Sequence, residues 1–230
     1  MTREIVLDTE TTGLSPATGD RIVEIGCVEL LNHIPTGKNF HAYINPERGM
    51  PEEAFRVHGL SDQFLSDKPK FNEIVGEFGE FIADSTLIIH NAPFDMGFLN
   101  AEFERVKKSP LLNVVIDTVM LARKVHPGAR VSLDSLCKHY GIDNSRRALH
   151  GALLDSEILA EVYLELIGGR QVTLALSAEI TTAIGNAVAG TWRAAQRPIP
   201  LPSPLSDLHR QAHKALVEAL GPDALWKAYE

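Results

Sequence analysis

Two carboxylates stand two residues apart at the end of an apolar run near the start of the chain. Ile5, Val6 and Leu7 form the run, and Asp8 and Glu10 follow it. Alternate side chains of an extended strand project from one face, so Asp8 and Glu10 are expected to point the same way if the strand geometry persists through them. Carboxylates this close repel each other unless protons or cations neutralise them. The pair alone is more typical of a solvated strand end, so a metal site requires further carboxylates nearby.

Two aspartates elsewhere in the chain can supply them. Asp95 follows the apolar segment 86–89, where a buried strand gives way to a helix, and α/β sheets build their sites at such strand ends. Asp155 lies five residues after His150. Five helical residues turn through about 140°, so both can face one site only if His150 lies in a loop or first turn. The loop-like segment 144–147 allows this.

The chemistry that these residue types suit is phosphoryl transfer. Four Asp and Glu oxygens favour hard cations such as Mg²⁺ or Mn²⁺ over zinc. Two such ions can stabilise the entering and leaving oxygens of an in-line displacement. His150 is then a candidate general base for the attacking water. An isolated histidine is more often structural, and the spacing to Asp155 is what favours the catalytic interpretation.

A mixed sheet is the expected scaffold for these residues. Apolar runs predict three strands in a meander, of which the first stops at Asp8 and enters a polar loop over 9–13, and the later segments alternate between strand and helix. Helices are therefore expected on both faces of the sheet. The predicted strands are 5–7, 21–31, 39–44, 86–89 and 114–116, and the predicted helices are about 51–57, 71–82, 94–106, 118–125, 132–137 and 152–167.

The character of the sequence changes after Gly169. Prolines alternate over 198–204, which predicts an extended linker. Ser206 or Asp207 can cap a final helix that ends at about 220 and carries an apolar stripe, and Leu225, Trp226 and Tyr229 lie in a second short segment. This stripe predicts either a small packed hairpin or a partner-binding element.

The charge balance excludes one simple mode of DNA binding. The chain has 22 Lys and Arg against 30 Asp and Glu, a net charge of −8, and the excess acid lies entirely within residues 1–170. This composition argues against binding nucleic acid by phosphate neutralisation alone. Cys27 and Cys137 lie in apolar segments, which predicts buried thiols in a reducing cytoplasm. No stretch approaches the ~18 apolar residues of a membrane span, so a soluble, cytoplasmic protein that is not exported is expected.

Three ordered motifs carry a family resemblance. Residues 5–13 (IVLDTETTG), 90–95 (HNAPFD) and 150–155 (HGALLD) resemble the exonuclease motifs of the DnaQ-like, DEDDh-type 3′–5′ exonucleases. The resemblance extends from residue 1 to about 169. It implies an α/β fold, a ribonuclease H-like five-stranded mixed sheet, with a C-terminal linker and a short helical tail.

The resemblance also implies residue roles. Asp8, Glu10 and Asp155 would be direct ligands of a site for two Mg²⁺ or Mn²⁺ ions, Asp95 would serve the second ion partly through water, and His150 would be the general base. The residues expected to contact the DNA 3′ end are Asp8, Thr9, Glu10, Thr11, Gly13, His58, Phe94 and Asp155.

The same resemblance implies that the chain has three segments with different partners. An exonuclease domain is expected over 1–170, a flexible linker over 171–204, and a polymerase-binding helical tail over 205–230. Residues 171–176 are similar to sliding-clamp-binding peptides, with Gln171, Leu174 and Leu176 as the contacts. The tail resembles, in its position and its closing Leu-Trp-Lys, the part of replicative members that holds the polymerase alpha subunit. The sequence leaves open whether a small accessory subunit also binds.

Proofreading during bacterial DNA replication is the function that these features favour, with removal of mismatched 3′-terminal nucleotides by two-metal hydrolysis. One alternative is a stand-alone relative that trims RNA or oligoribonucleotides, but such an enzyme needs neither linker nor apolar tail. Another is a non-catalytic scaffold that joins clamp and polymerase, which would not need all five of the acidic and histidine site residues.

Overall fold

The computed structural model describes residues 2–145, 149–168 and 206–220. The chain divides into two units, Met1–Leu174 and Ala175–Glu230. The proline-rich linker, the candidate clamp peptide 171–176 and the segment with Leu225, Trp226 and Tyr229 lie outside the described residues.

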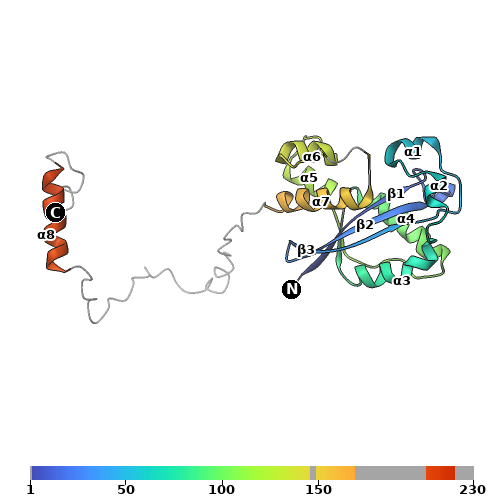
Figure 1. The fold of residues 1–230 in the computed structure, drawn as a ribbon, viewed down its shortest axis with the longest axis horizontal. Coiled ribbons are helices and arrows are strands. Elements are labelled where there is room, and N and C mark those ends of the chain that lie inside the picture. The colour runs from blue at the N-terminus through green and yellow to red at the C-terminus, as the bar shows by residue number, and fades with distance from the viewer. Residues whose placement is uncertain (1, 146–148, 169–205, 221–230) are drawn as a thin grey trace, which may run out of the picture. The chain divides into compact units, whose positions relative to one another are not determined.

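A five-stranded mixed sheet forms the centre of the first unit (Figure 1). Its strand order is β3-β2-β1-β4-β5, with antiparallel pairing of β1 to β2 and β2 to β3, and parallel pairing of β1 to β4 and β4 to β5. This arrangement confirms the predicted meander followed by strand–helix alternation. The strands are β1 (Arg3–Thr11), β2 (Ile22–Leu31), β3 (Ile34–Tyr43), β4 (Thr86–Ile89) and β5 (Val115–Asp117).

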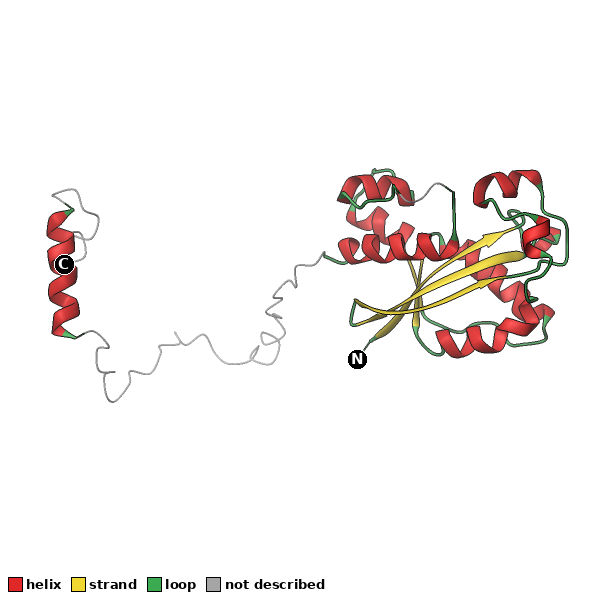
Figure 2. Cartoon of the chain, in the orientation of Figure 1, coloured by secondary structure: helices red, strands yellow, loops and turns green. Residues whose placement is uncertain are grey.

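Helices cover both faces of the sheet, as Figure 2 shows in red around the yellow strands. One core packs α3 and α4 on side chains such as Ile5 and Leu7, and the other packs α5, α6 and α7 on side chains such as Val6 and Ile88. Alternate residues of β1 therefore enter opposite cores, as strand geometry requires. The helices of this unit are α1 (Glu52–His58), α2 (Asp62–Leu65), α3 (Phe71–Ile82), α4 (Ala92–Arg105), α5 (Thr118–Val125), α6 (Leu133–Tyr140) and α7 (Ala152–Leu166), with a short 3-10 turn, η1 (Pro16–Thr18).

Several local predictions are confirmed, and three details differ. Ser132 caps α6 by accepting a hydrogen bond from the Ser135 N–H, and both cysteines are buried. The short elements η1 and α2 were not predicted, because neither has a full period of apolar residues. Strand β3 begins at Ile34 rather than 39, since its first six residues are exposed and lack an apolar face.

The second unit contains one described helix, α8 (Asp207–Ala219). Ser206 caps it by accepting from the His209 N–H, as the sequence predicts. Leu208, Leu216 and Leu220 are exposed, whereas Val217 is buried. Within the described ranges of the chain, no helix is both long enough and apolar enough to cross a lipid bilayer.

Candidate active site

Strand β1 presents the first two carboxylates from one face. It continues through Thr11, so the predicted polar loop over 9–13 is wrong for residues 9–11, and Asp8 and Glu10 both lie within the strand. Pairing with β2 holds this extension, with Asp8 opposite Gly26 and Glu10 opposite Glu24. The backbone hydrogen bonds to β2 stabilise the extended conformation here, although the side chains of this part of β1 are polar. The strand geometry therefore fixes the directions of both carboxylates.

Helix α7 brings Asp155 to the same face, and Gly26 lets it approach. A Cβ at position 26 would lie 2.2 Å from the backbone of Ala152 and Leu153, so only glycine fits beneath the first turn of α7. The Ser156 hydroxyl donates a hydrogen bond of 2.9 Å to the Gly26 carbonyl and fastens the helix there. Asp155 lies in this first turn and is only 2% exposed.

Glu10, His150 and Asp155 converge. Each offers one ligand atom, and these atoms lie within 4.8 Å of one another. His150 Nδ1 is 3.2 Å from Asp155 Oδ2, and about half of the His150 side chain is exposed. His150 precedes the helix, as predicted from its spacing to Asp155. Among the described residues, Asp8 and Asp95 are not members of this close trio.

Helix α1 anchors the loop that carries His150. The His150 N–H donates to the Val57 carbonyl at 3.1 Å. Next to it, the Leu149 side chain packs over Gly59, where an added Cβ would come within 2.7 Å of Leu149 Cδ1. The candidate base is therefore held by an element some 90 residues away in sequence.

Asp95 is turned toward β1 by Thr9. Its Oδ1 accepts hydrogen bonds from the Thr9 N–H at 3.1 Å and the Thr9 hydroxyl at 2.7 Å. Burial raises the pKa of Asp95 to about 7, against the lowering effect of the bonds from Thr9. A buried carboxyl with a raised pKa, here in the first turn of α4, is a candidate functional group.

Asp117 is a supporting residue that sequence reasoning missed. Its Oδ1 accepts from the Asn91 N–H at 3.2 Å and from the Val119 N–H at 2.8 Å, which caps α5. Asn91 has a left-handed backbone, with φ of 67°, directly before α4. Asp117 thus ties the ends of β4 and β5 to the start of the helix that carries Asp95. An aspartate just before a helical period is an N-cap signal that could have indicated it.

A pocket of about 270 Å³ adjoins the carboxylates, which is near the lower end of small-ligand sites. Six of the residues expected to contact DNA line it: Thr9, Glu10, Thr11, Gly13, His58 and Phe94. Asp8 and Asp155 are not among its lining residues. The lining residues that the sequence did not indicate are Thr12, Leu14, Pro51, Glu53, Ala54 and Val57.

His58 lines this pocket and carries a buried ring N–H. Its side chain is buried, and Nδ1 accepts from the Leu60 N–H at 3.1 Å, so the proton of the neutral ring lies on Nε2. Burial lowers the pKa of His58, which favours this neutral form. Within the described part of the chain Nε2 has no hydrogen bond of good geometry, although the nearby Thr11 backbone acts to raise the pKa of His58. A buried donor without a partner is costly and is satisfied when a ligand supplies an acceptor.

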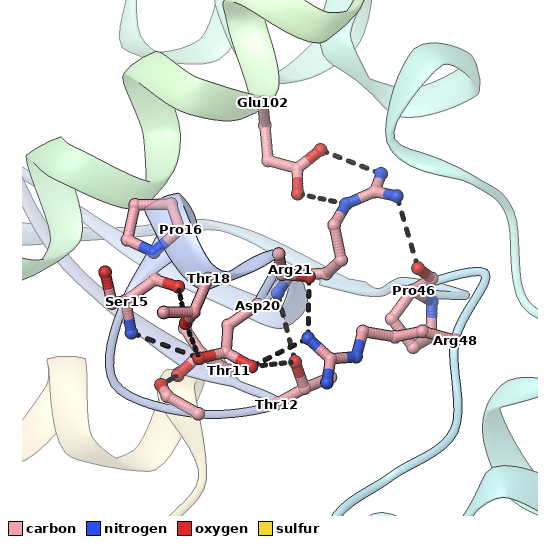
Figure 3. Close-up of polar contacts among 12 residues, drawn as sticks. Thr11, Thr12, Ser15, Pro16, Thr18, Asp20, Arg21, Pro46, Arg48 and Glu102 are labelled. Atoms are coloured by element: carbon pink, nitrogen blue, oxygen red, sulfur yellow. Dashed lines mark hydrogen bonds and ion pairs between the residues drawn. The ribbon is translucent and has the colours of Figure 1, made fainter.

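The loop between β1 and β2 forms the rim of the pocket, and Figure 3 shows how it is held. Asp20 accepts hydrogen bonds from the Ser15 N–H and the Thr18 hydroxyl and pairs with Arg48 at 2.7 Å. Arg21, which follows it, forms two bonds to Glu102 on α4, of 2.6 and 2.9 Å. The loop is thereby tied to α4 and to the segment before α1.

The donor set fits a hard divalent cation. Glu10 and Asp155 are nearly buried, and Asp8 lies on the same face of β1. Neighbouring carboxylates repel one another in a buried setting, and a divalent ion reduces that repulsion. Oxygen donors favour such ions, and His150 is the one nitrogen donor in the trio.

Comparison with known proteins identifies the class. Residues 5–163 match the family profile described as Exonuclease. The fold resembles that of exonuclease X in complex with 5′ overhanging duplex DNA, with a TM-score of 0.57, 24% identity, and coverage of 71% of this chain and 90% of that one. An exonuclease I from Methylocaldum szegediense gives a TM-score of 0.64 at 20% identity, covering 74% of this chain and 41% of that one. The family match places the chain among exonucleases, and the fold agrees with it.

Curated relatives give the particular family. The DNA polymerase III subunit epsilon of Rickettsia typhi is 59% identical over 175 residues, 74% of this chain and 76% of that protein. The subunit epsilon of Escherichia coli K12 is 46% identical over 240 residues, 99% of this chain and 98% of that protein. This chain therefore belongs to the exonuclease family and, within it, to the DNA polymerase III epsilon subunits.

Proposed function

We propose that this chain is the proofreading 3′–5′ exodeoxyribonuclease of a bacterial replicative polymerase. The observation that carries the proposal is the convergence of Glu10, His150 and Asp155 beside a pocket of nucleotide-binding character. The pocket is closed on one side by the end of β1 and on the other by α1. The whole-length similarity to epsilon subunits favours this function over a stand-alone RNA-trimming enzyme and over a non-catalytic scaffold.

The carboxylates are proposed to hold two divalent cations, Mg²⁺ or Mn²⁺. Asp8, Glu10 and Asp155 would be direct ligands, with Asp95 serving the second ion partly through water. The bound cations would supply positive charge for the entering and leaving oxygens of the phosphodiester. Asp95, already aligned by two hydrogen bonds from Thr9, would lose its proton as the ions bind.

His150 is proposed as the general base. Its half-exposed ring can take a proton from water, while Nδ1 lies 3.2 Å from an Asp155 oxygen. That carboxylate stabilises the protonated ring once the water has been deprotonated. The hydrogen bond from the His150 N–H to the Val57 carbonyl would hold this residue beside the bound substrate.

The pocket residues are proposed to hold the terminal nucleotide. His58 Nε2–H is a neutral donor to an oxygen of the nucleotide, and Phe94 offers an aromatic surface for its sugar or base. Thr9, Thr11 and Gly13 bring backbone and hydroxyl groups to the same end. A pocket that accepts one unstacked nucleotide favours mismatched ends, because frayed termini enter at lower cost.

The C-terminal segments are proposed as tethers. Residues 1–170 would form the exonuclease domain and 171–204 a linker with a clamp-binding peptide at Gln171, Leu174 and Leu176. The tail 205–230 would bind the polymerase alpha subunit, and the exposed leucines of α8 support a partner on that helix. The proposal places the protein in the cytoplasm with the replicating chromosome.

A nuclease assay with matched variants tests the central proposal. Full-length protein and Mg²⁺ should shorten a 5′-labelled DNA by single nucleotides, faster from a mismatched than a paired 3′ end, and faster than from an RNA end. Asp8→Ala with Glu10→Ala should abolish cleavage. The control, Glu80→Ala with Asp84→Ala, removes two exposed carboxylates of the α3 end and should cut normally. Normal cutting by the Asp8/Glu10 variant would refute the metal assignment.

A further inference from the structure

A second pocket, of about 440 Å³, lies between the start of α3 and the end of α4. Its lining is mainly charged and comprises Arg21, Glu47, Lys70, Phe71, Asn72, Arg105, Val106 and Lys107. We call it the basic pocket. None of the predicted site residues belongs to it, and the proposed chemistry does not use it.

The charges of the basic pocket do not cancel. Arg21 forms a two-bond pair with Glu102, and Arg105 shares that carboxylate at 2.9 Å. Lys70 pairs with Glu47, and their hydrogen bond lowers the pKa of Glu47, which keeps it charged. No carboxylate in the described residues pairs with Lys107. Glu73 also faces Lys70 and accepts a hydrogen bond from its N–H. Four cations thus face three carboxylates, and one positive charge remains in a chain whose net charge is −8.

Lys107 occupies a backbone position that does not favour lysine. Its φ is 59°, in the left-handed region just after α4, where glycine is the residue without steric cost. A side chain here costs about 1 kcal/mol in backbone strain. Strained positions with an exposed functional group are often retained for what the side chain does.

The basic pocket adjoins the active-site pocket through the loop 12–20. Thr12 lines the active-site pocket and exchanges two hydrogen bonds with Arg21, from its N–H to the Arg21 carbonyl and from the Arg21 N–H to its hydroxyl. Arg105 donates to the Pro16 carbonyl of the same loop at 3.4 Å. Leu14 of the same loop lines the active-site pocket and is 86% exposed. Figure 3 shows this loop with Arg21 and Glu102.

We infer that the basic pocket binds backbone phosphates of the DNA strand whose 3′-terminal nucleotide lies in the active-site pocket. This inference rests on the proposed function. A strand that leaves the active-site pocket over the loop 12–20 would come next to Arg105, which contacts that loop, and to Lys107 in the same basic pocket. Excess cations beside a nucleotide-sized pocket are the usual means of tracking a single strand without reading its sequence. The basic pocket would thus supply the phosphate contacts that the overall acidity argues against.

Lys107→Gly separates this role from a structural one. Glycine relieves the left-handed strain, so the melting temperature should stay the same or rise. The KM for a 12-nucleotide single strand should rise about fivefold with kcat unchanged, because one exposed phosphate contact is lost. The salt dependence of log KM should become shallower by about 0.7, the value for one phosphate on a single strand. A dinucleotide, too short to reach the basic pocket, should be cleaved as by the wild type.

Two further variants and a binding measurement with inorganic phosphate complete the test. Lys107→Arg keeps the charge and should retain the wild-type salt dependence, whereas Lys124→Ala removes an exposed charge from α5 and should change nothing. An unchanged KM and salt dependence in Lys107→Gly would overturn the inference. The inference would also be overturned if inorganic phosphate bound only when Lys107 was present but the KM for DNA did not depend on Lys107. If the wild-type protein cut neither DNA nor the dinucleotide, the proposed function itself would be refuted. Cleavage of the dinucleotide therefore distinguishes a failure of this inference from a failure of the proposed function.

Discussion

A single methyl group at position 26 should disable the active site without touching a ligand. In Gly26→Ala the new Cβ would lie 2.2 Å from the backbone of Ala152 and Leu153, whereas ordinary contact starts at 3.4 Å. The difference is 1.2 Å. The obstructing atoms are backbone and not the end of a flexible side chain, so the first turn of α7 must retreat by about that distance or β2 must bend.

The retreat moves Asp155 away from Glu10. Ligand distances at metal sites tolerate only about 0.2 Å, and a misplacement of about 1 Å in a catalytic site costs on the order of 100-fold in rate. We therefore expect kcat to fall about 100-fold. Overpacking should lower the free energy of unfolding by about 2 kcal/mol, which includes a weakened bond from Ser156 to the Gly26 carbonyl.

Cleavage of a single-stranded oligonucleotide, with urea unfolding of the same samples, measures both effects. Gly79→Ala is the matched control: nothing lies within 4 Å of a Cβ there, so this α3 substitution should keep wild-type kcat and add about 0.5–1 kcal/mol. A Gly26→Ala protein with wild-type kcat and stability would refute the reasoning that α7 depends on this glycine for its approach.

Three shorter predictions follow from the same site. Burial raises the pKa of Asp95 above its ordinary value of 3.8 to about 7. Between these two pH values the metal-free folded protein binds more protons than the unfolded chain. Its free energy of unfolding therefore falls as the pH rises from the lower value to the higher one. Asp95→Asn should reduce that loss, measured by urea unfolding in chelator at pH 5 and 8. Leu149→Ala should lower kcat about tenfold with little change in KM, because the loop of His150 loses its contact with α1, and Leu149→Met should restore most of it. Mg²⁺ should raise the melting temperature of the wild type but not of Glu10→Gln with Asp155→Asn; an equal rise in both would contradict the ligand assignment.

The sheet and most helices could be predicted because their signals are local. The apolar run of β4 and the period of α3 are complete within their own segments. The end of β1 was mispredicted because Thr9–Thr11 is polar and resembles a loop by composition. It is strand because β2 pairs with it and because threonine fits a pleated surface.

The supports of the site could not be predicted, because they join segments far apart in sequence. Gly26 contacts the start of α7 about 126 residues later, and Val57 binds His150 93 residues later. Neither glycine nor valine carries a chemical signal in such a role. The candidate ligands could be recognised because carboxylates in apolar surroundings are unusual. The residues that position them are common residue types, so the sequence does not distinguish them.

The distribution of charge explains how an acidic chain can act on an acidic polymer. Glu10 and Asp155 would repel the scissile phosphate, and bound cations would reverse the sign of the potential there. The excess charge around Lys107 lies one loop away and would hold the strand at a few phosphates only. Weak holding suits an editing enzyme, since a correctly paired end must be able to leave. If the tail and linker tether the domain to the polymerase, local concentration replaces the missing affinity. Low intrinsic affinity would then make editing depend on fraying of the 3′ end and not on capture by the nuclease.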